Sequence, residues 1–359
     1  MEKRENQTRL LWLDIAKGIV MLLVVFGHTV RGGAAQQAVY GFHVPAFFLL
    51  SGMSAGFSRH KKGRLKNDFL RIMVPYYIWG LISIGIYLVL GHVARDKLGV
   101  DADATLGNNV YGLIFASSRT HYMRYNLPLW FLPCLFASKA VFYGLQRLLN
   151  RRTEYILAAS ALLCVLGFVY SAAGLPCLPF ALEIAVKMLP FFALGNFVME
   201  QEKLLKTINA SKTRALLAGL VLLAAAVALA LINGKVNYSS DAFSNPLLYH
   251  VGALAGCAGV VLLSAGIGRC RILSYVGQNT MGVLVMHKFP VMFFQIFGPV
   301  AGMLKNTESI LSAAAGAAVS VAAVGMCLVA SWIVMKIFPF ALGAAMKKTA
   351  AQQELPKKN

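Results

Sequence analysis

Apolar residues run through this chain in long segments that short polar stretches separate. Each segment holds close to the ~20 residues that an α-helix needs to cross the hydrocarbon core of a bilayer. The pattern predicts an all-α, polytopic bundle of about ten transmembrane helices. They are expected at 11–30, 39–57, 72–91, 127–146, 155–174, 179–199, 214–232, 247–267, 273–298 and 310–337.

Composition agrees with a membrane protein. Hydrophobic residues make up 58% and charged residues 13% of the chain, whereas soluble domains average about 25% charged residues. No linker separates domains, so residues 1–345 are expected to form one membrane domain, followed by a short basic cytoplasmic tail at 346–359. Asp14 and Lys17 interrupt the first segment, which favours a retained helix over a cleaved signal peptide.

The formal net charge of +20 would suit nucleic-acid binding if it formed a surface patch. Lys and Arg instead gather in alternate connections between the predicted helices, and the positive-inside rule places such connections in the cytoplasm. Both termini are then cytoplasmic, the number of spans is even, and no nucleic-acid partner is expected. A protein of a bacterial-type cytoplasmic (inner) membrane, with the bilayer as its surroundings, is predicted. The basic connections lie at 3–9, 59–71, 147–152, 203–214, 269–271 and 347–358.

Ionisable residues in the first predicted helix need an explanation, because each costs ~2.5–3.5 kcal/mol to insert at the centre of a bilayer. Lys17 and His28 are eleven positions apart, which places them on nearly the same face and ~16 Å apart along the axis. Asp14 lies one turn from Lys17, close enough for an ion pair. These residues are either a neutralised pair and an interfacial histidine, or parts of one site.

Other polar residues are predicted at the depth of His28. His43 begins the second predicted helix, Trp130 begins the fourth, and His287 lies in the outer half of the ninth. Their common depth favours one shared site over separate interfacial side chains. Three imidazoles can bind zinc, but no carboxylate is placed to orient them. The six cysteines form no C-x-x-C pair, and no metal is expected.

Six stretches spread along the chain resemble those of one enzyme family. They are LDIAKGIVMLLVVFGH, FHVPAFFLLSG, RIMVPYYIWG, LPLWFLPCLF, LPFFALGNF and YVGQNTMGVLVMH. In this order they resemble the acyltransferase 3 family, particularly its fucose 4-O-acetylase-like branch. The resemblance implies an integral membrane O-acyltransferase that moves acetyl from acetyl-CoA to a hydroxyl of a glycan or related acceptor.

The resemblance also implies roles for residues of the first helix. The family carries there an arginine, ten intervening residues before a histidine thought to be catalytic, and this spacing falls on Lys17 and His28. Imidazole has a pKa suited to a general base near neutrality, so His28 is expected to be the base, with Asp14 and His43 as further catalytic candidates. Lysine at position 17 keeps the charge of arginine but loses its planar grip on phosphate.

The two substrates are expected to bind at opposite ends of the bundle. The basic connection at 59–71 offers six cations to the phosphates of acetyl-CoA, and Lys17, Arg64 and Arg71 are the expected donor-binding residues. The long outer connection at 92–126 ends in the stretch SSRTHYMRYNLPLWF, where aromatic and basic side chains could bind a sugar or form an interfacial belt. The expected acceptor-binding residues are Tyr122, Arg124, Trp130 and His287.

Two other classes of function stay open on the sequence alone. A proton-coupled transporter of a small polar or anionic substrate could use the histidines and the Asp–Lys pair as a proton relay. It predicts broken helices in paired halves of the chain, which the sequence does not indicate. A purely structural role would leave the clustered histidines unexplained.

Overall fold

The computed structural model describes residues 2–30, 32–56, 63–98, 105–116, 124–238, 240–297, 301–305 and 309–344. Almost all of this part of the chain is helical, apart from an antiparallel ribbon of β1 (Val236–Asn237) and β2 (Ala242–Phe243). Nine helices in the described ranges are long and apolar enough to cross a membrane. The predicted all-α transmembrane bundle is therefore confirmed.

Most predicted spans correspond to one long helix each. These are α1 (Glu2–Thr29), α5 (Val74–Leu98), α7 (Phe131–Leu148), α8 (Thr153–Ala172), α9 (Leu182–Val198), α11 (Lys212–Asn233), α12 (Pro246–Ile267) and α17 (Ile310–Ile337). The second span consists of α2 (Gly33–Tyr40) and α3 (His43–Gly56). The shorter connecting elements are α4 (Arg64–Asp68), η1 (Phe69–Met73), α6 (Leu106–Phe115), η2 (Arg124–Trp130), η3 (Pro179–Ala181), α10 (Glu202–Ala210), α16 (Ala301–Lys305) and η4 (Pro339–Leu342).

The span expected at 273–298 is the exception, because it is divided into α13 (Arg271–Gln278), α14 (Thr280–Met286) and α15 (Lys288–Phe297). Pro290 explains the second interruption, since its ring nitrogen has no hydrogen for the carbonyl four residues earlier. Asn126 donates its amide to the Val285 carbonyl at 2.9 Å and so satisfies a backbone acceptor next to the break. The prediction of one continuous helix is corrected here, and His287 lies at the interruption.

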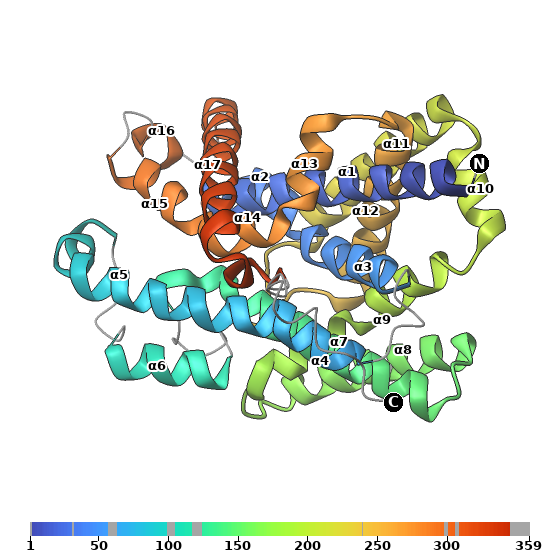
Figure 1. Ribbon diagram of the computed structural model, residues 1–359, viewed down its shortest axis with the longest axis horizontal. Coiled ribbons are helices and arrows are strands. Elements are labelled where there is room, and N and C mark those ends of the chain that lie inside the picture. The colour runs from blue at the N-terminus through green and yellow to red at the C-terminus, as the bar shows by residue number, and fades with distance from the viewer. Residues whose placement is uncertain are drawn as a thin grey trace, which may run out of the picture.

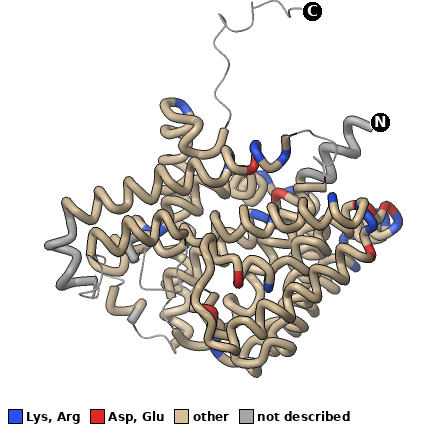
Figure 2. Tube along the Cα trace, turned by 90° about the horizontal axis from the view of Figure 1, so that it is seen from below, with Lys and Arg blue, Asp and Glu red and all other residues tan. Residues whose placement is uncertain are grey.

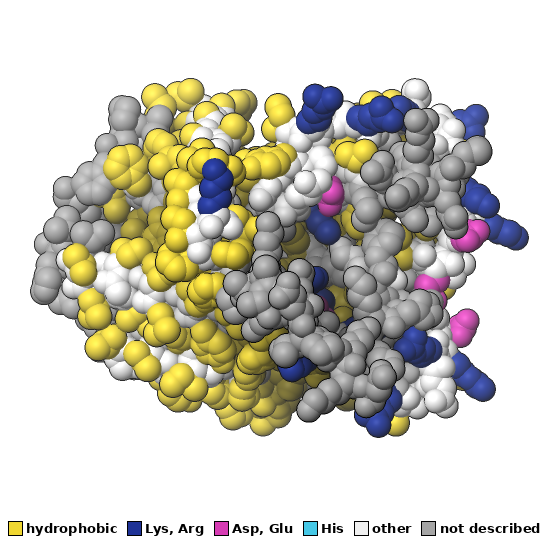
Figure 3. Space-filling view, viewed as in Figure 1, with side chains coloured by type: hydrophobic (Ala, Val, Ile, Leu, Met, Phe, Trp, Pro, Cys, Tyr) yellow, Lys and Arg dark blue, Asp and Glu magenta, His cyan; other side chains and the backbone are white. Residues whose placement is uncertain are grey.

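Charge is distributed unevenly along the longest axis of the molecule. α1 and α5 run along this axis in the same sense, with α10 at one end and α6, α15 and α16 at the other (Figure 1). Most Lys and Arg residues gather toward the α10 end (Figure 2). Apolar side chains cover most of the visible surface away from that end (Figure 3). This asymmetry is what the alternate basic connections predict, whereas cytoplasmic termini stay a prediction.

Glycines bring the backbones of α3 and α9 into direct contact. A Cβ atom at Gly195 would clash with the Leu49 carbonyl, and one at Gly52 would clash with the Phe192 carbonyl. Gly18 in the same way lets α1 approach the backbone of α13. Small residues at helix crossings allow this close approach in membrane bundles. The crossings fix α1 and α3, which carry two of the predicted site histidines.

Candidate functional site

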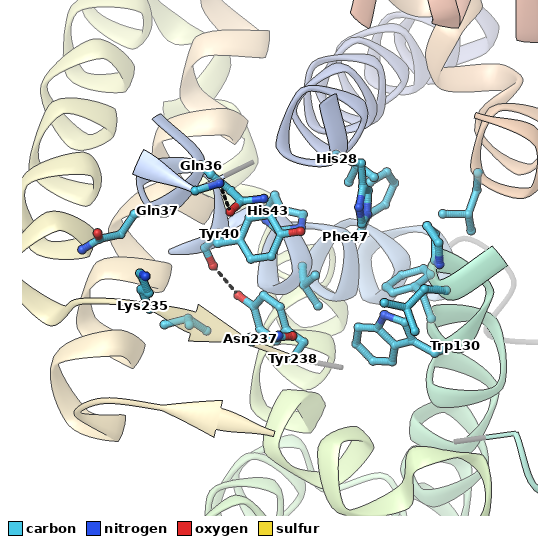
Figure 4. A pocket seen from close by; sticks show the side chains of 18 of the residues that line it. His28, Gln36, Gln37, Tyr40, His43, Phe47, Trp130, Lys235, Asn237 and Tyr238 are labelled. Atoms are coloured by element: carbon cyan, nitrogen blue, oxygen red, sulfur yellow. Dashed lines mark hydrogen bonds between the residues drawn. The ribbon is translucent and has the colours of Figure 1, made fainter. Parts of the chain in front are cut away.

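A cavity of about 310 Å³ lies where α1, α2, α3, η2 and the β1–β2 ribbon meet. Its volume is within the range of small-ligand pockets. Figure 4 shows side chains from these separate elements converging on one space. Apolar residues such as Val24 and Phe47 form part of the wall. The polar and aromatic side chains of the lining are His28, Gln36, Gln37, Tyr40, His43, Trp130, Lys235, Asn237 and Tyr238.

His28 lies in the last turn of α1, half-buried, and lines the cavity. Its ring nitrogens make no hydrogen bond within the part of the chain that the structure describes. Its backbone, in contrast, is held firmly, because Gln295 of α15 donates to the His28 and Thr29 carbonyls at 3.1 and 3.0 Å. His28 therefore combines a fixed backbone with ring nitrogens that are open to a ligand.

The turn after α1 brings α2 back over the cavity. Gly32 and Gly33 both have positive φ, 78° and 71°, a conformation that only glycine adopts readily. Gln36 closes the turn, since its amide donates to the Gly27 and Val30 carbonyls at 2.8 and 3.0 Å and accepts from the Gly32 amide at 2.9 Å. This tight turn places the Tyr40 ring 6.4 Å from that of His28.

His43 approaches the same space from α3. It is 3% exposed, and its Nδ1 lies 2.8 Å from the Val39 carbonyl. Because a carbonyl can only accept, Nδ1 carries the hydrogen and Nε2 of the neutral ring is an acceptor. The His43 ring lies 4.9 Å from Tyr40 and 5.8 Å from Tyr238. The structure thus brings two of the predicted catalytic residues, His28 and His43, to one cavity.

β1 and the residues that flank it form another part of the cavity wall, in contact with α2. Tyr238 donates its hydroxyl to the Tyr40 carbonyl at 2.8 Å and lies 2.7 Å from the Tyr249 hydroxyl. Its ring stacks on Trp130, with centroids 6.4 Å apart and planes 19° from parallel. Burial raises the pKa of the Tyr238 hydroxyl well above its ordinary value, so the group stays a donor. Asp241 and Lys187 anchor the ribbon through a buried ion pair of 2.5 Å.

His287 lies behind His28 rather than in the cavity wall. It is completely buried, it is not among the lining residues, and its ring centroid is 5.2 Å from that of His28. Trp130, by contrast, lines the cavity directly. Tyr122 lies outside the described residues, as does the side chain of Arg124. Among residues that are described, no three His, Cys, Asp or Glu side chains could hold a metal ion.

The expected donor-binding residues lie near Lys139 and do not line the cavity. Lys139 forms an ion pair with Asp68 at 2.7 Å, and Tyr143 donates to the other oxygen of that carboxylate at 2.7 Å. The Arg64 guanidinium lies over the Tyr143 ring at 4.1 Å. Lys139 also interacts electrostatically with Arg64, Arg71 and Lys17. These side chains form one group, called the cation cluster below: Lys17, Arg64, Arg71 and Lys139.

Asp14 lies at the same end of α1 as Lys17 and not at the cavity. It accepts a hydrogen bond from the Gln278 amide at 3.0 Å, and it interacts electrostatically with Lys17. It lies fourteen positions before His28 in the helix, which is about 21 Å along the axis. The structure does not bring Asp14 into contact with the predicted base.

Sequence reasoning missed the parts of the site that come from short elements. Gln36 and Gln37 fall in the predicted first outer connection, although two adjacent glutamines beside an apolar span were an available signal. Tyr40 falls at the start of the span predicted at 39–57, where it was not singled out. Lys235 and Tyr238 flank β1 on either side, and a strand of two residues is too short to show the alternation that reveals a strand.

One comparison with known proteins bears on this chain. A family model described as an acyltransferase domain, that of the acyltransferase 3 family, matches residues 10–336. The match runs from within α1 to within the last turn of α17 and includes every described residue that lines the cavity. No curated protein and no solved structure matches the chain.

Proposed function

The chain belongs to the acyltransferase 3 family and is a membrane acyltransferase, and from this premise we propose that it transfers an acetyl group from acetyl-CoA to a hydroxyl of a glycan or related acceptor. The observation that carries the proposal is the cavity in which His28 and His43 meet Trp130. Histidines supply a base for the hydroxyl, and the aromatic wall supplies a surface for the apolar face of a sugar.

His28 is the proposed general base. It takes the proton of the acceptor hydroxyl while the hydroxyl oxygen bonds to the thioester carbonyl carbon. The carbon–sulfur bond then breaks, and the leaving thiolate receives that proton from the imidazolium. Atoms and charges balance, and the protein returns to its starting state after each transfer.

The cavity also offers hydrogen-bond donors that the protein itself does not use. The Tyr40 hydroxyl and the Trp130 indole N–H both belong to the lining, and neither makes a side-chain hydrogen bond within the described ranges. Donors of this kind can bind acceptor hydroxyls or the developing negative charge on the thioester oxygen. We assign the Trp130 side chain to the acceptor. The Tyr40 hydroxyl can donate either to an acceptor hydroxyl or to the thioester oxygen.

The cation cluster is the proposed site of the anionic end of acetyl-CoA. Lys17 does not line the cavity, and it lies ~16 Å along α1 from His28. In this proposal the phosphates stay at the cluster while the thioester extends along α1 toward His28. The cluster then faces the cytoplasm of a bacterial-type inner membrane, and the acceptor site lies toward the outer face.

One structural observation favours the alternative of a proton-coupled transporter. The α2–α3 and α13–α15 segments are both interrupted, and broken helices are common in transporters. The two classes differ in what happens to acetyl-CoA. Purified protein in nanodiscs, given radiolabelled acetyl-CoA and a panel of hydroxylated sugars, should release one CoA for each acetyl group that becomes attached to a sugar. Intact acetyl-CoA, together with uptake of the sugars or anions by proteoliposomes, would reject the enzyme and favour the transporter.

A further inference from the structure

His287 holds a buried acceptor that the described part of the protein leaves unused. Its Nδ1 lies 3.0 Å from the Val283 carbonyl and 2.9 Å from the Leu284 carbonyl. Because carbonyls only accept, Nδ1 carries the hydrogen, and Nε2 of the neutral ring has a free lone pair. Nε2 is buried and has no hydrogen-bond partner among the residues that the structure describes. Buried polar atoms without a partner are few in native proteins, and each one calls for an explanation such as a catalytic role or a bound water.

The ring next to His287 is that of His28. Their centroids are 5.2 Å apart and their planes are tilted by 39°. The broken segment that carries His287 also carries Gln295, which binds the carbonyls at the end of α1. One segment therefore fixes both the backbone of His28 and the imidazole next to its ring, and of these two histidines only His28 lines the cavity.

We propose that His287 is a positioning residue for His28: its Nε2 accepts the hydrogen of one His28 ring nitrogen and leaves the lone pair of the other nitrogen for the acceptor hydroxyl. The two adjacent rings do not make this bond in the structure, so it forms when the His28 ring turns toward Nε2 as the acceptor binds. This inference rests on the proposed function, in which His28 is the base. During transfer the hydroxyl proton moves to the free nitrogen of His28 and leaves on the thiol of CoA. His287 neither gains nor loses a proton. It selects the tautomer of His28 and stabilises the imidazolium, as a carboxylate does beside the histidine of serine hydrolases.

Two amide substitutions separate this role from a purely structural one. The amide of His287→Gln can place an acceptor near the position of Nε2, whereas the amide of His287→Asn replaces only Nδ1 and its bonds to the helix carbonyls. We expect His287→Asn and His287→Phe to lower kcat for acetyl transfer about tenfold, the effect of one hydrogen bond lost in the transition state. His287→Gln should keep most of kcat, and the KM for acetyl-CoA should stay unchanged in all three variants.

His28→Ala, measured in the same assay, distinguishes the two levels of the proposal. Wild-type transfer by His28→Ala would contradict the proposed function itself. Two results would overturn the positioning role alone, provided that His28→Ala loses transfer. One is full activity in His287→Phe, and the other is equal activity in His287→Asn and His287→Gln. Nitrogen NMR of the wild-type protein with labelled histidines covers the case in which the variants unfold. An unprotonated Nε2 on His287 is expected, and a hydrogen on that atom would overturn the inference.

Discussion

Polar residues that stand alone in separate apolar helices are explained by the cavity that they line together. His28, His43 and Trp130 were predicted at one depth from helix register, and they line one cavity. That prediction works because the rise per residue of an α-helix is fixed, so position in the sequence converts into depth. The same conversion of sequence position into depth places Asp14 and Lys17 toward the opposite end of α1. Lys235 and Tyr238 could not be placed, because their position depends on a ribbon held by distant side chains.

Trp130 gives the sharpest residue-level prediction about the acceptor. Trp130→Ala should raise the KM for the acceptor about tenfold, equivalent to about 1.4 kcal/mol. The substitution removes an aromatic part of the cavity wall, which stacking on Tyr238 holds in place. Steady-state acetylation at varied acceptor concentration measures this effect, and the KM for acetyl-CoA should not change. Trp332→Ala is the matched control, since Trp332 is 54% exposed on α17. Equal acceptor KM values in the two variants would remove Trp130 from the acceptor site.

At the level of helices, several of the family-like stretches serve packing rather than chemistry. FHVPAFFLLSG and LPFFALGNF contain Gly52 and Gly195, which bring the backbones of α3 and α9 together. YVGQNTMGVLVMH contains Gly277, where a Cβ would clash with the backbone of α1 at Asp14. Hydropathy alone could predict that these helices exist, but not which of them touch, because many apolar helices offer equivalent surfaces.

The α3–α9 crossing can be tested with two glycines in different surroundings. Gly195→Ala should lower the midpoint of thermal unfolding in detergent, because overpacking a close contact costs about 1–3 kcal/mol. Gly325→Ala, in α17, should leave the midpoint unchanged or raise it, since nothing lies within 4 Å of the added Cβ and alanine favours helix. A Gly195→Ala protein as stable as Gly325→Ala would show that the backbone contact is absent.

The broken segment at α13–α15 marks the limit of what hydropathy could predict. Residues 273–298 are apolar enough to be expected as one helix, yet Pro290 and the tertiary bond from Asn126 divide it. The interruption places His287 and Gln295 against the end of α1. Pro290 is a local signal of the second break, whereas the bonds from Asn126 and to the end of α1 join distant parts of the chain, and no local pattern contains them.

Across the whole molecule, the cation cluster and the cavity lie at different depths along α1, in agreement with one donor end and one acceptor end. Lys17→Ala should raise the KM for acetyl-CoA about tenfold, because a charge-assisted hydrogen bond to phosphate is worth about 1.5–3 kcal/mol. Lys17→Arg keeps the charge and adds a planar fork for phosphate, so its KM should be equal or lower. Lys206→Ala is the control, because that side chain is 77% exposed. A Lys17→Ala enzyme with an unchanged KM would separate the cluster from donor binding.

The role of His28 as the base is tested by the rate of acetyl transfer in His28→Ala compared with His250→Ala. His250 lies near the start of α12, stacks on Phe191 and does not line the cavity. Loss of a general base lowers kcat by about 10²–10⁴-fold. We expect a loss of this size in His28→Ala, with folding and acetyl-CoA binding retained. His250→Ala should transfer acetyl at close to the wild-type rate. Wild-type turnover by a folded His28→Ala protein, measured as acetyl groups attached to the acceptor, would contradict a reaction centred on this cavity.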